Sequence, residues 1–159
     1  MLNFLGNSEA KLDNKGRVPV PAQFRKLLQS VGAESLVLQK DIFRNCLTIY
    51  PPDVWEENVS EFQSRLNKWN SEHRQLLRQF VDAERVEIDP SGRILISKRY
   101  LKDLNIKSDV QFLGVVNIIE MWPKGNLEET IIPSEEFGQK IERLMGETPG
   151  AGNQQPITE

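Results

Sequence analysis

Residues 12–20 of this chain read LDNKGRVPV, and residues 88–96 read IDPSGRILI. Both stretches follow one pattern: an apolar residue, Asp, two variable residues, Gly, Arg, and then apolar residues at alternate positions. A second match follows in the same order, because LTIYP at residues 47–51 corresponds to IEMWP at residues 119–123. Two matched segments in one order indicate an internal duplication. We therefore expect two tandem modules, at residues 7–55 and 83–126.

Each copy of the repeat predicts a tight turn. An Asp side chain suits the first position, since its carboxylate accepts hydrogen bonds from the backbone amides that follow it. Gly16 and Gly92 then lie where a type I turn is followed by a left-handed residue, as in a hairpin with a G1 bulge. We expect a β-hairpin in each module. The apolar residues of its two arms should face inward: Ala10, Leu12, Val18 and Val20 in the first module, and Val86, Ile88, Ile94 and Ile96 in the second.

The segments after each turn predict a short helix and two more strands. We expect helices at residues 21–29 and 98–104, opened by Pro21 and capped by Ser97. Each module is too small to bury its own sheet, so the two copies should complete one barrel-like core between them. The remaining strands are expected at residues 35–39 and 46–50 in the first module, and at residues 110–115 and 118–122 in the second.

Residues 56–82 predict a helical insert between the modules. Apolar side chains recur there at helical spacing, and Asn70-Ser71 is a candidate break that would give a helical hairpin. Asp53 followed by Glu56 is typical of a capping box. We interpret the apolar stripe as packing rather than as a platform for nucleic-acid bases. It consists of Trp55, Val59, Phe62, Leu66, Trp69, His73, Leu76 and Phe80.

Acidic side chains concentrate after residue 123, although the net charge of the chain is only −3. The main body is therefore close to neutral and can present a local basic surface. We expect a C-terminal segment with a helix from Ser134 within residues 127–146, and a disordered tail at residues 147–159, which is rich in Gly, Pro and Gln. The simplest interpretation of the acidic end is a solvated, flexible segment, and the alternative is a mimic of DNA.

Composition argues against several classes of protein. No apolar run approaches the roughly 18–20 residues that span a bilayer, and the first residues lack the features of a secretory signal. The chain has a single cysteine, Cys46, and a single histidine, His73. It can therefore form no internal disulfide, and neither cysteines nor histidines alone can build a metal site. Phosphate loops and nucleophile motifs of enzymes are missing. We expect a cytoplasmic protein that is not an enzyme, holds no cofactor or metal and does not enter a membrane.

The arginine that recurs in both turns is the strongest candidate for function. One interpretation is an ion pair that closes each turn, Asp13 with Arg17 and Asp89 with Arg93, and exposed pairs of this kind add little stability. The other is binding, because rigidly placed guanidinium groups make bidentate contacts with phosphate or guanine. Both can hold if Asp orients the Arg that binds. The predicted DNA-binding residues are Lys11, Lys15, Arg17, Arg25, Arg93 and Arg99, and the predicted turn-forming residues are Asp13, Gly16, Asp89 and Gly92.

The two repeated segments resemble the bacterial MraZ family, whose members carry two tandem AbrB-type (SpoVT-AbrB) DNA-binding modules. The similarity extends over about residues 1–145, and Asn14 stands where Ser is common in the family. The resemblance implies a mainly β, α+β fold: a duplicated, swapped-hairpin, AbrB-like double-split β-barrel with a helical insert. It also implies closed, octamer-like homo-oligomeric rings.

The resemblance further implies a nucleoid-associated, sequence-specific regulator of transcription. Such a protein binds repeated sequences in double-stranded promoter DNA and usually represses the division and cell-wall gene cluster, including its own gene. Weak sites repeated around a ring would gain through effective concentration. No small-molecule substrate is expected. Two alternatives stay open: an AbrB-type antitoxin or global regulator with little operator specificity, and a structural ring that binds protein only.

Overall fold

The computed structural model describes residues 2–146 of the chain. The chain divides into two compact units, Met1–Leu127 and Glu128–Glu159. The predicted tail at residues 147–159 lies outside the described residues. Across the described part, every helix is too short or too polar to cross a lipid bilayer.

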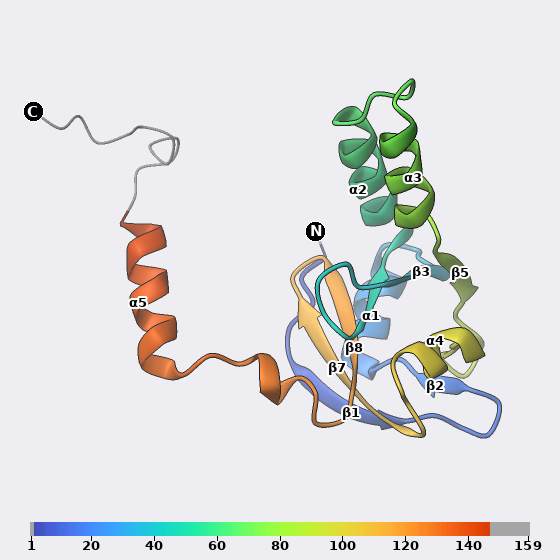
Figure 1. Ribbon diagram of the computed structural model, residues 1–159. Helices are drawn as coiled ribbons and strands as arrows, with labels where there is room; N and C mark the ends of the chain where they lie inside the picture. Colours follow the sequence, from blue (N-terminus) through green and yellow to red (C-terminus); the bar gives the residue numbers. More distant parts are fainter. Residues whose placement is uncertain (1, 147–159) are drawn as a thin grey trace, which may run out of the picture. The chain divides into compact units, whose positions relative to one another are not determined.

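The first unit has a mixed α+β fold in which the helix and the two strands expected after each turn appear within one or two residues of their predicted bounds (Figure 1). Every pair of strands among the described residues is antiparallel. Its elements are β1 (Asn7–Lys11), β2 (Arg17–Pro19), α1 (Ala22–Ser30), β3 (Ser35–Lys40), β4 (Leu47–Tyr50), α2 (Pro52–Ser64), α3 (Ser71–Phe80), β5 (Glu84–Glu87), β6 (Arg93–Leu95), α4 (Lys98–Asp103), β7 (Asp109–Val115) and β8 (Ile118–Pro123).

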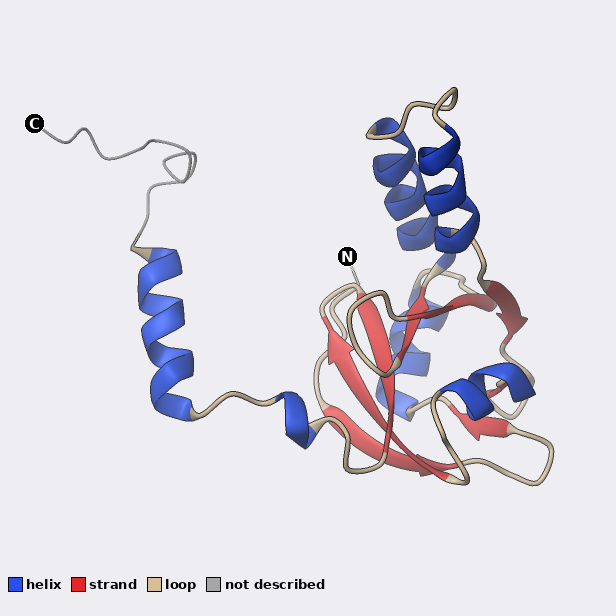
Figure 2. Cartoon of the chain, viewed as in Figure 1, coloured by secondary structure: helices blue, strands red, loops and turns tan. Residues whose placement is uncertain are grey.

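The strands of the two modules interlock in one antiparallel sheet (Figure 2). Its order is β1-β7-β8-β4-β3-β5, so β1 of the first module pairs with β7 of the second, and β5 of the second pairs with β3 of the first. Strands β4 and β8, the last of each module, pair in the middle. A separate two-stranded sheet joins β2 to β6. The duplicated halves therefore contribute alternating pieces to one structure.

Both predicted turns form, but the predicted hairpins beyond them are wrong. Gly16 N donates to Asp13 O (3.1 Å) and Gly92 N to Asp89 O (2.8 Å), and both glycines have the positive φ of a G1 bulge, 84° and 79°. Past the turn the two arms separate, because β1 pairs with β7 and β2 pairs with β6. Pairing across the modules places Val18 opposite Ile94, and both side chains are buried. The core between the modules therefore buries more apolar surface than a hairpin with a three-residue arm could bury within one module.

One apolar core contains side chains from both modules, as expected. The second arms place their apolar residues inward, and Val18, Val20, Ile94 and Ile96 are each at most 2% exposed. Phe4 and Phe24 meet edge to face in the same core, with ring centroids 5.4 Å apart. The shared core explains why neither module forms a separate body in the structure.

The insert forms the predicted helical hairpin from α2 and α3, which stands away from the sheet (Figure 1). Its base is aromatic: Trp55 and Phe80 stack at 5.9 Å, and Phe62 and Phe80 stack at 4.3 Å. The stripe is packed only in part, since Trp69 is 82% exposed and Leu76 is 50% exposed.

Two predicted helix caps are wrong. Helix α2 begins at Pro52 and makes no side-chain cap, because two prolines already set the entry and Pro52 has no amide hydrogen to satisfy. Ser97 occupies the N-cap position of α4, but its hydroxyl is buried and makes no hydrogen bond among the described residues. The cap that does form is at Asn70, whose side chain accepts hydrogen bonds from the amides of Glu72 and His73.

The second unit contains a short 3-10 helix, Glu128–Thr130, and α5, Ser134–Met145. The start of α5 at Ser134 confirms the prediction. Its apolar residues, among them Phe137 and Ile141, are exposed.

Candidate nucleic-acid interface

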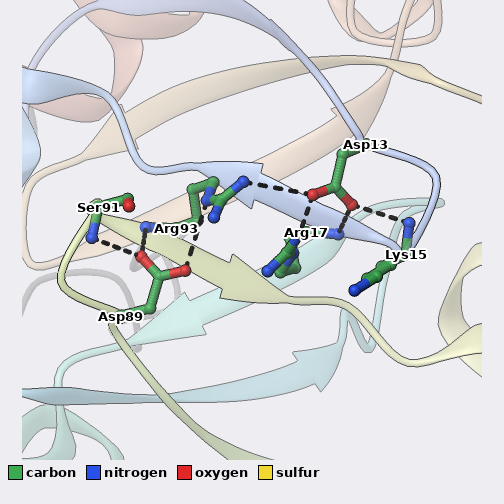
Figure 3. A network of polar contacts seen from close by, with 6 residues as sticks. All are labelled: Asp13, Lys15, Arg17, Asp89, Ser91 and Arg93. Carbon is green, nitrogen blue, oxygen red and sulfur yellow. Dashed lines mark hydrogen bonds and ion pairs between the residues drawn. The ribbon is translucent and has the colours of Figure 1, made fainter.

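The two Asp-to-Arg turns lie at opposite ends of the antiparallel pair that strands β2 and β6 form (Figure 3). Val20 N, just after β2, donates to Gly92 O, and Ile96 N, just after β6, donates to Gly16 O, both at 2.9 Å. Each turn is therefore anchored by the strand that follows the other turn. Residues far apart in sequence form one rigid, nearly symmetric structure.

Each aspartate orients the arginine of its own turn. Asp13 Oδ1 accepts hydrogen bonds from the amides of Lys15 and Arg17, both at 2.9 Å, and Asp13 Oδ2 accepts one from Arg17 Nε at 2.8 Å. In the second turn, Asp89 Oδ1 accepts from the amides of Ser91 (2.8 Å) and Arg93 (2.9 Å). The predicted pairing of each Asp with its Arg is confirmed.

One contact joins the two turns and was missed by sequence reasoning. Arg93 Nη1 donates to Asp13 Oδ2 at 3.4 Å, while Arg93 Nε lies 3.4 Å from Asp89 Oδ2 (Figure 3). Arg93 is thus shared between two carboxylates, and Asp13 holds two arginines. No signal in the sequence pointed to this contact, because it depends on the pairing of β2 with β6.

The hydrogen bonds of the turns keep both carboxylates charged. The backbone amide of Arg17, followed by the Lys15 amide and the Arg17 side chain, holds the pKa of Asp13 below its usual value. The amide and side chain of Arg93 do the same for the pKa of Asp89. The side chains of Arg17 and Arg93 are 34% and 32% exposed. Each arginine is therefore oriented by an aspartate and still reaches solvent.

The other predicted DNA-binding residues are placed differently. Lys15 is exposed at the tip of the first turn, and Lys11 is exposed 4.0 Å from Asp109. Arg25 Nε donates to Val20 O at 3.0 Å, and its side chain packs directly against Gly92.

Arg99 is held by acidic neighbours away from the turns. Its guanidinium pairs with Asp82 at 3.0 Å and with Glu84 at 3.4 Å, and it stacks on Tyr100. The structure therefore brings together Lys15, Arg17 and Arg93, with Arg25 supporting the second turn, and leaves Arg99 in an ion-pair network of its own.

Comparison with known proteins matches the duplication. The profile of a family described as "MraZ protein, putative antitoxin-like" matches residues 3–79 and again residues 80–146. The chain belongs to the MraZ family. The two matched segments of this MraZ chain each contain one of the Asp-to-Arg turns.

Curated relatives extend the MraZ match over nearly the whole chain. A Bacteroides thetaiotaomicron protein named transcriptional regulator MraZ is 51% identical over 148 residues, which cover 92% of this chain and 95% of the relative. A relative of the same name from Phocaeicola vulgatus is 49% identical, with 91% of this chain and 95% of the relative covered. One from Syntrophobacter fumaroxidans is 34% identical, with the same coverage. The relatives that match this MraZ chain over nearly its whole length are thus named as transcriptional regulators.

Proposed function

We propose that this MraZ protein regulates transcription by binding double-stranded DNA through its paired arginine turns. The observation that carries the proposal is the network in which Asp13 and Asp89 orient Arg17 and Arg93 on one rigid support. Pre-oriented guanidinium groups lose little freedom on binding, which favours contacts with base edges as well as with phosphates. The shared name of the relatives, transcriptional regulator MraZ, supports the same function.

The β2–β6 pair suits the major groove of DNA. A two-stranded ribbon fits that groove, and alternate residues along the pair face away from the core. Val18 and Ile94 are buried beneath it, whereas Arg17, Pro19, Arg93 and Leu95 lie on its outer face and Leu95 is 53% exposed. Lys15 stands beside this face, where an ammonium group would contact a phosphate.

Finer parts of the proposal concern assembly and target. The interlocked strands support an AbrB-like, swapped-hairpin double-split barrel, and we propose that copies of it form a closed, octamer-like ring. Repeated weak sites would let a chain of net charge −3 bind an operator that contains spaced repeats. The proposed target is the promoter of the chain's own division and cell-wall gene cluster in the nucleoid of the cytoplasm, and the proposed effect is repression. Light scattering of the purified protein should show a large homo-oligomer, and a stable monomer at micromolar concentration would contradict the ring.

The description of the family as antitoxin-like favours one second candidate. An antitoxin or global regulator of AbrB type would bind DNA through the same turns but with little preference for one operator. The two candidates differ in the ratio of affinities for the promoter and for unrelated DNA of equal length, which a competition titration measures.

The test of DNA binding is the double variant Arg17→Ala/Arg93→Ala. A titration of the DNA upstream of the chain's own gene, at several salt concentrations, should show a loss of at least about 10-fold in affinity, since one base-reading arginine contributes roughly 1–3 kcal/mol. The matched control is Arg65→Ala, which removes an exposed arginine paired with Glu61 on α2. Thermal melts identify the folded variants. Unchanged DNA affinity in a folded double variant would overturn the proposal.

A further inference from the structure

Three side chains that can bind a metal ion meet on the outer face of the six-stranded sheet. Asp41 begins the loop between β3 and β4, Cys46 precedes β4, and Glu120 lies in β8. One ligand atom from each of the three lies within 4.8 Å of the others. The site therefore joins a loop of the first module to a strand of the second.

The alternation of side chains along two paired strands creates this arrangement. Strands β4 and β8 pair with Thr48 opposite Glu120. Leu47 and Met121, which neighbour them, belong to the main core, so Thr48 and Glu120 face the other side of the sheet. Cys46 is two residues before Thr48 and shares that face.

The Cys46 thiol is buried, and it has no hydrogen-bond partner within the part of the chain that the structure describes. Cys46 is 0% exposed and packs against Trp122 and Leu127. Among residues 2–146, its sulfur takes part in no hydrogen bond, although a carboxylate oxygen of Asp41 and one of Glu120 lie within 4.8 Å of it. Burial, together with these two carboxylates, raises the pKa of the thiol. A buried thiol that is directed at two carboxylates has no role in the apolar core or in the arginine turns.

Both carboxylates are held by neutral donors. Asp41 Oδ1 accepts a hydrogen bond from the Thr48 hydroxyl at 2.8 Å, and Asp41 Oδ2 accepts from the amides of Phe43 (3.0 Å) and Arg44 (2.8 Å). Glu120 Oε1 accepts from the Trp122 indole at 3.0 Å. Carboxylates that bind metal ions are usually oriented by hydrogen bonds of this kind.

The site lacks a positive charge of its own. Within the described residues, no ion pair involves Asp41 or Glu120. Burial and the neighbouring Asp41 raise the pKa of Glu120, although the indole hydrogen bond opposes that shift. Two carboxylates whose oxygens lie within 4.8 Å of each other, with no cationic side chain paired to either among the described residues, attract a cation to the place between them.

We propose that Asp41, Cys46 and Glu120 bind one Zn²⁺ ion or a similar divalent transition metal, with water as a fourth ligand. A thiolate and two carboxylates are ligands that zinc accepts in tetrahedral geometry. On binding, the thiol proton passes to solvent and a metal–sulfur bond forms. Tetrahedral ligands lie about 3.5 Å apart, so ligand atoms that are now within 4.8 Å of one another would have to approach by at most about 1.3 Å. The bound ion would fasten the loop of the first module to β8 of the second.

This inference is independent of DNA binding, and a spectroscopic titration tests it. The full-length protein, stripped with a chelator, is titrated with Co²⁺ and then with Zn²⁺. We expect one cobalt ion per chain, a thiolate-to-cobalt charge-transfer band in the near ultraviolet, and loss of that band when zinc displaces cobalt. Because the chain has one cysteine, such a band reports ligation by Cys46 alone.

Variants locate the site within the fold. Cys46→Ser should abolish the band, and Glu120→Gln should weaken cobalt binding by at least about 10-fold. The control is Glu57→Gln on α2, where Asp53, Glu56 and Glu61 offer an exposed acidic surface that could gather cations without a built site. Cobalt bound without a thiolate band, or binding that Glu57→Gln reduces and Glu120→Gln does not, would overturn the proposal. Absence of cobalt binding to the unmodified chain would overturn it too.

Discussion

The two turns carry the same motif, yet their surroundings differ. In the first, Asp13 holds both Arg17 and Arg93, and Lys15 stands at the tip. In the second, Asp89 holds Arg93 alone, and the corresponding tip residue is Ser91. Nearly identical backbones thus present two arginines with different degrees of neutralisation. Local sequence determines the turn, and the neighbour from the other module determines how much charge remains for a ligand.

The glycines of the turns show the same contrast in packing. A side chain at Gly16 would meet Ile96 O at 3.0 Å and Leu101 at 3.6 Å, so it would press on backbone that cannot move. A side chain at Gly92 would collide with the Arg25 guanidinium, which lies at the end of a flexible side chain. The first turn is therefore confined by main chain, and the second is covered by a charged side chain.

The largest expected difference concerns the two arginines taken singly. Arg17 pairs with Asp13 through Nε, and no hydrogen bond from its Nη atoms is found among the described residues, whereas Arg93 is divided between two carboxylates. Arg17→Ala should therefore lower DNA affinity by about 10-fold or more, and Arg93→Ala by less. Promoter titrations of both single variants measure the difference. Equal losses would show that the sharing of Arg93 does not matter for binding.

The next effect concerns the stability of the turns. Both glycines have positive φ, so Gly16→Ala and Gly92→Ala should each lower the free energy of unfolding by about 1–2 kcal/mol. Adding Arg25→Ala should relieve part of the cost of Gly92→Ala, because it removes the colliding side chain, and should leave the cost of Gly16→Ala unchanged. Urea unfolding of the single and double variants provides the comparison. Additive effects at Gly92 would contradict the proposed role of Arg25 as its cover.

A smaller effect is expected from exchanging the tip residues. Lys15→Ser should reduce the dependence of log affinity on log salt by about one unit, and Ser91→Lys should raise it by about as much, since one phosphate contact is lost or gained. The measurement is the promoter titration at four or more salt concentrations. If Ser91→Lys has no effect while Lys15→Ser does, the second turn does not face the DNA backbone.

The smallest effect is the dependence of stability on pH. Folding lowers the pKa of Asp13 and of Asp89. Their contribution to the free energy of unfolding is therefore fully present above the ordinary aspartate pKa of about 3.9, and it is lost as the pH falls through the lowered values. Asp13→Asn should therefore be less stable than the unmodified chain at neutral pH and should approach it in acid. Asp89→Asn should show a smaller gap, since Asp89 holds one arginine and Asp13 holds two. Thermal midpoints between neutral and acidic pH test both variants.

Sequence reasoning reached much of the site because its chemistry is local. Asp13, Gly16 and Arg17 lie within one turn, so their spacing alone predicts the positive φ of the glycine and the pairing of Asp with Arg. The same holds for Asp89, Gly92 and Arg93. The helix of the C-terminal segment and the break in the insert were also predicted, since both follow from periodicity and from residues that begin or end helices.

What the sequence missed depends on partners distant in the chain. The arms of the expected hairpins pair across modules, and the bond from Arg93 to Asp13 follows from that pairing. A count of one cysteine and one histidine argued against a metal site, yet the alignment of β4 with β8 brings Asp41, Cys46 and Glu120 within 4.8 Å. Neither result has a signal in the local sequence.

By itself, the sequence determined the duplication, the two turns, the order of helices and strands and the membership of the MraZ family, because these features follow from residue spacing within short segments. Only the tertiary structure decided which strands pair, which arginine is shared and which acidic residues meet the buried thiol. The physical reason is that an arm of three to five residues has too little surface to select its partner strand, so the pairing is decided by the common core that both modules bury.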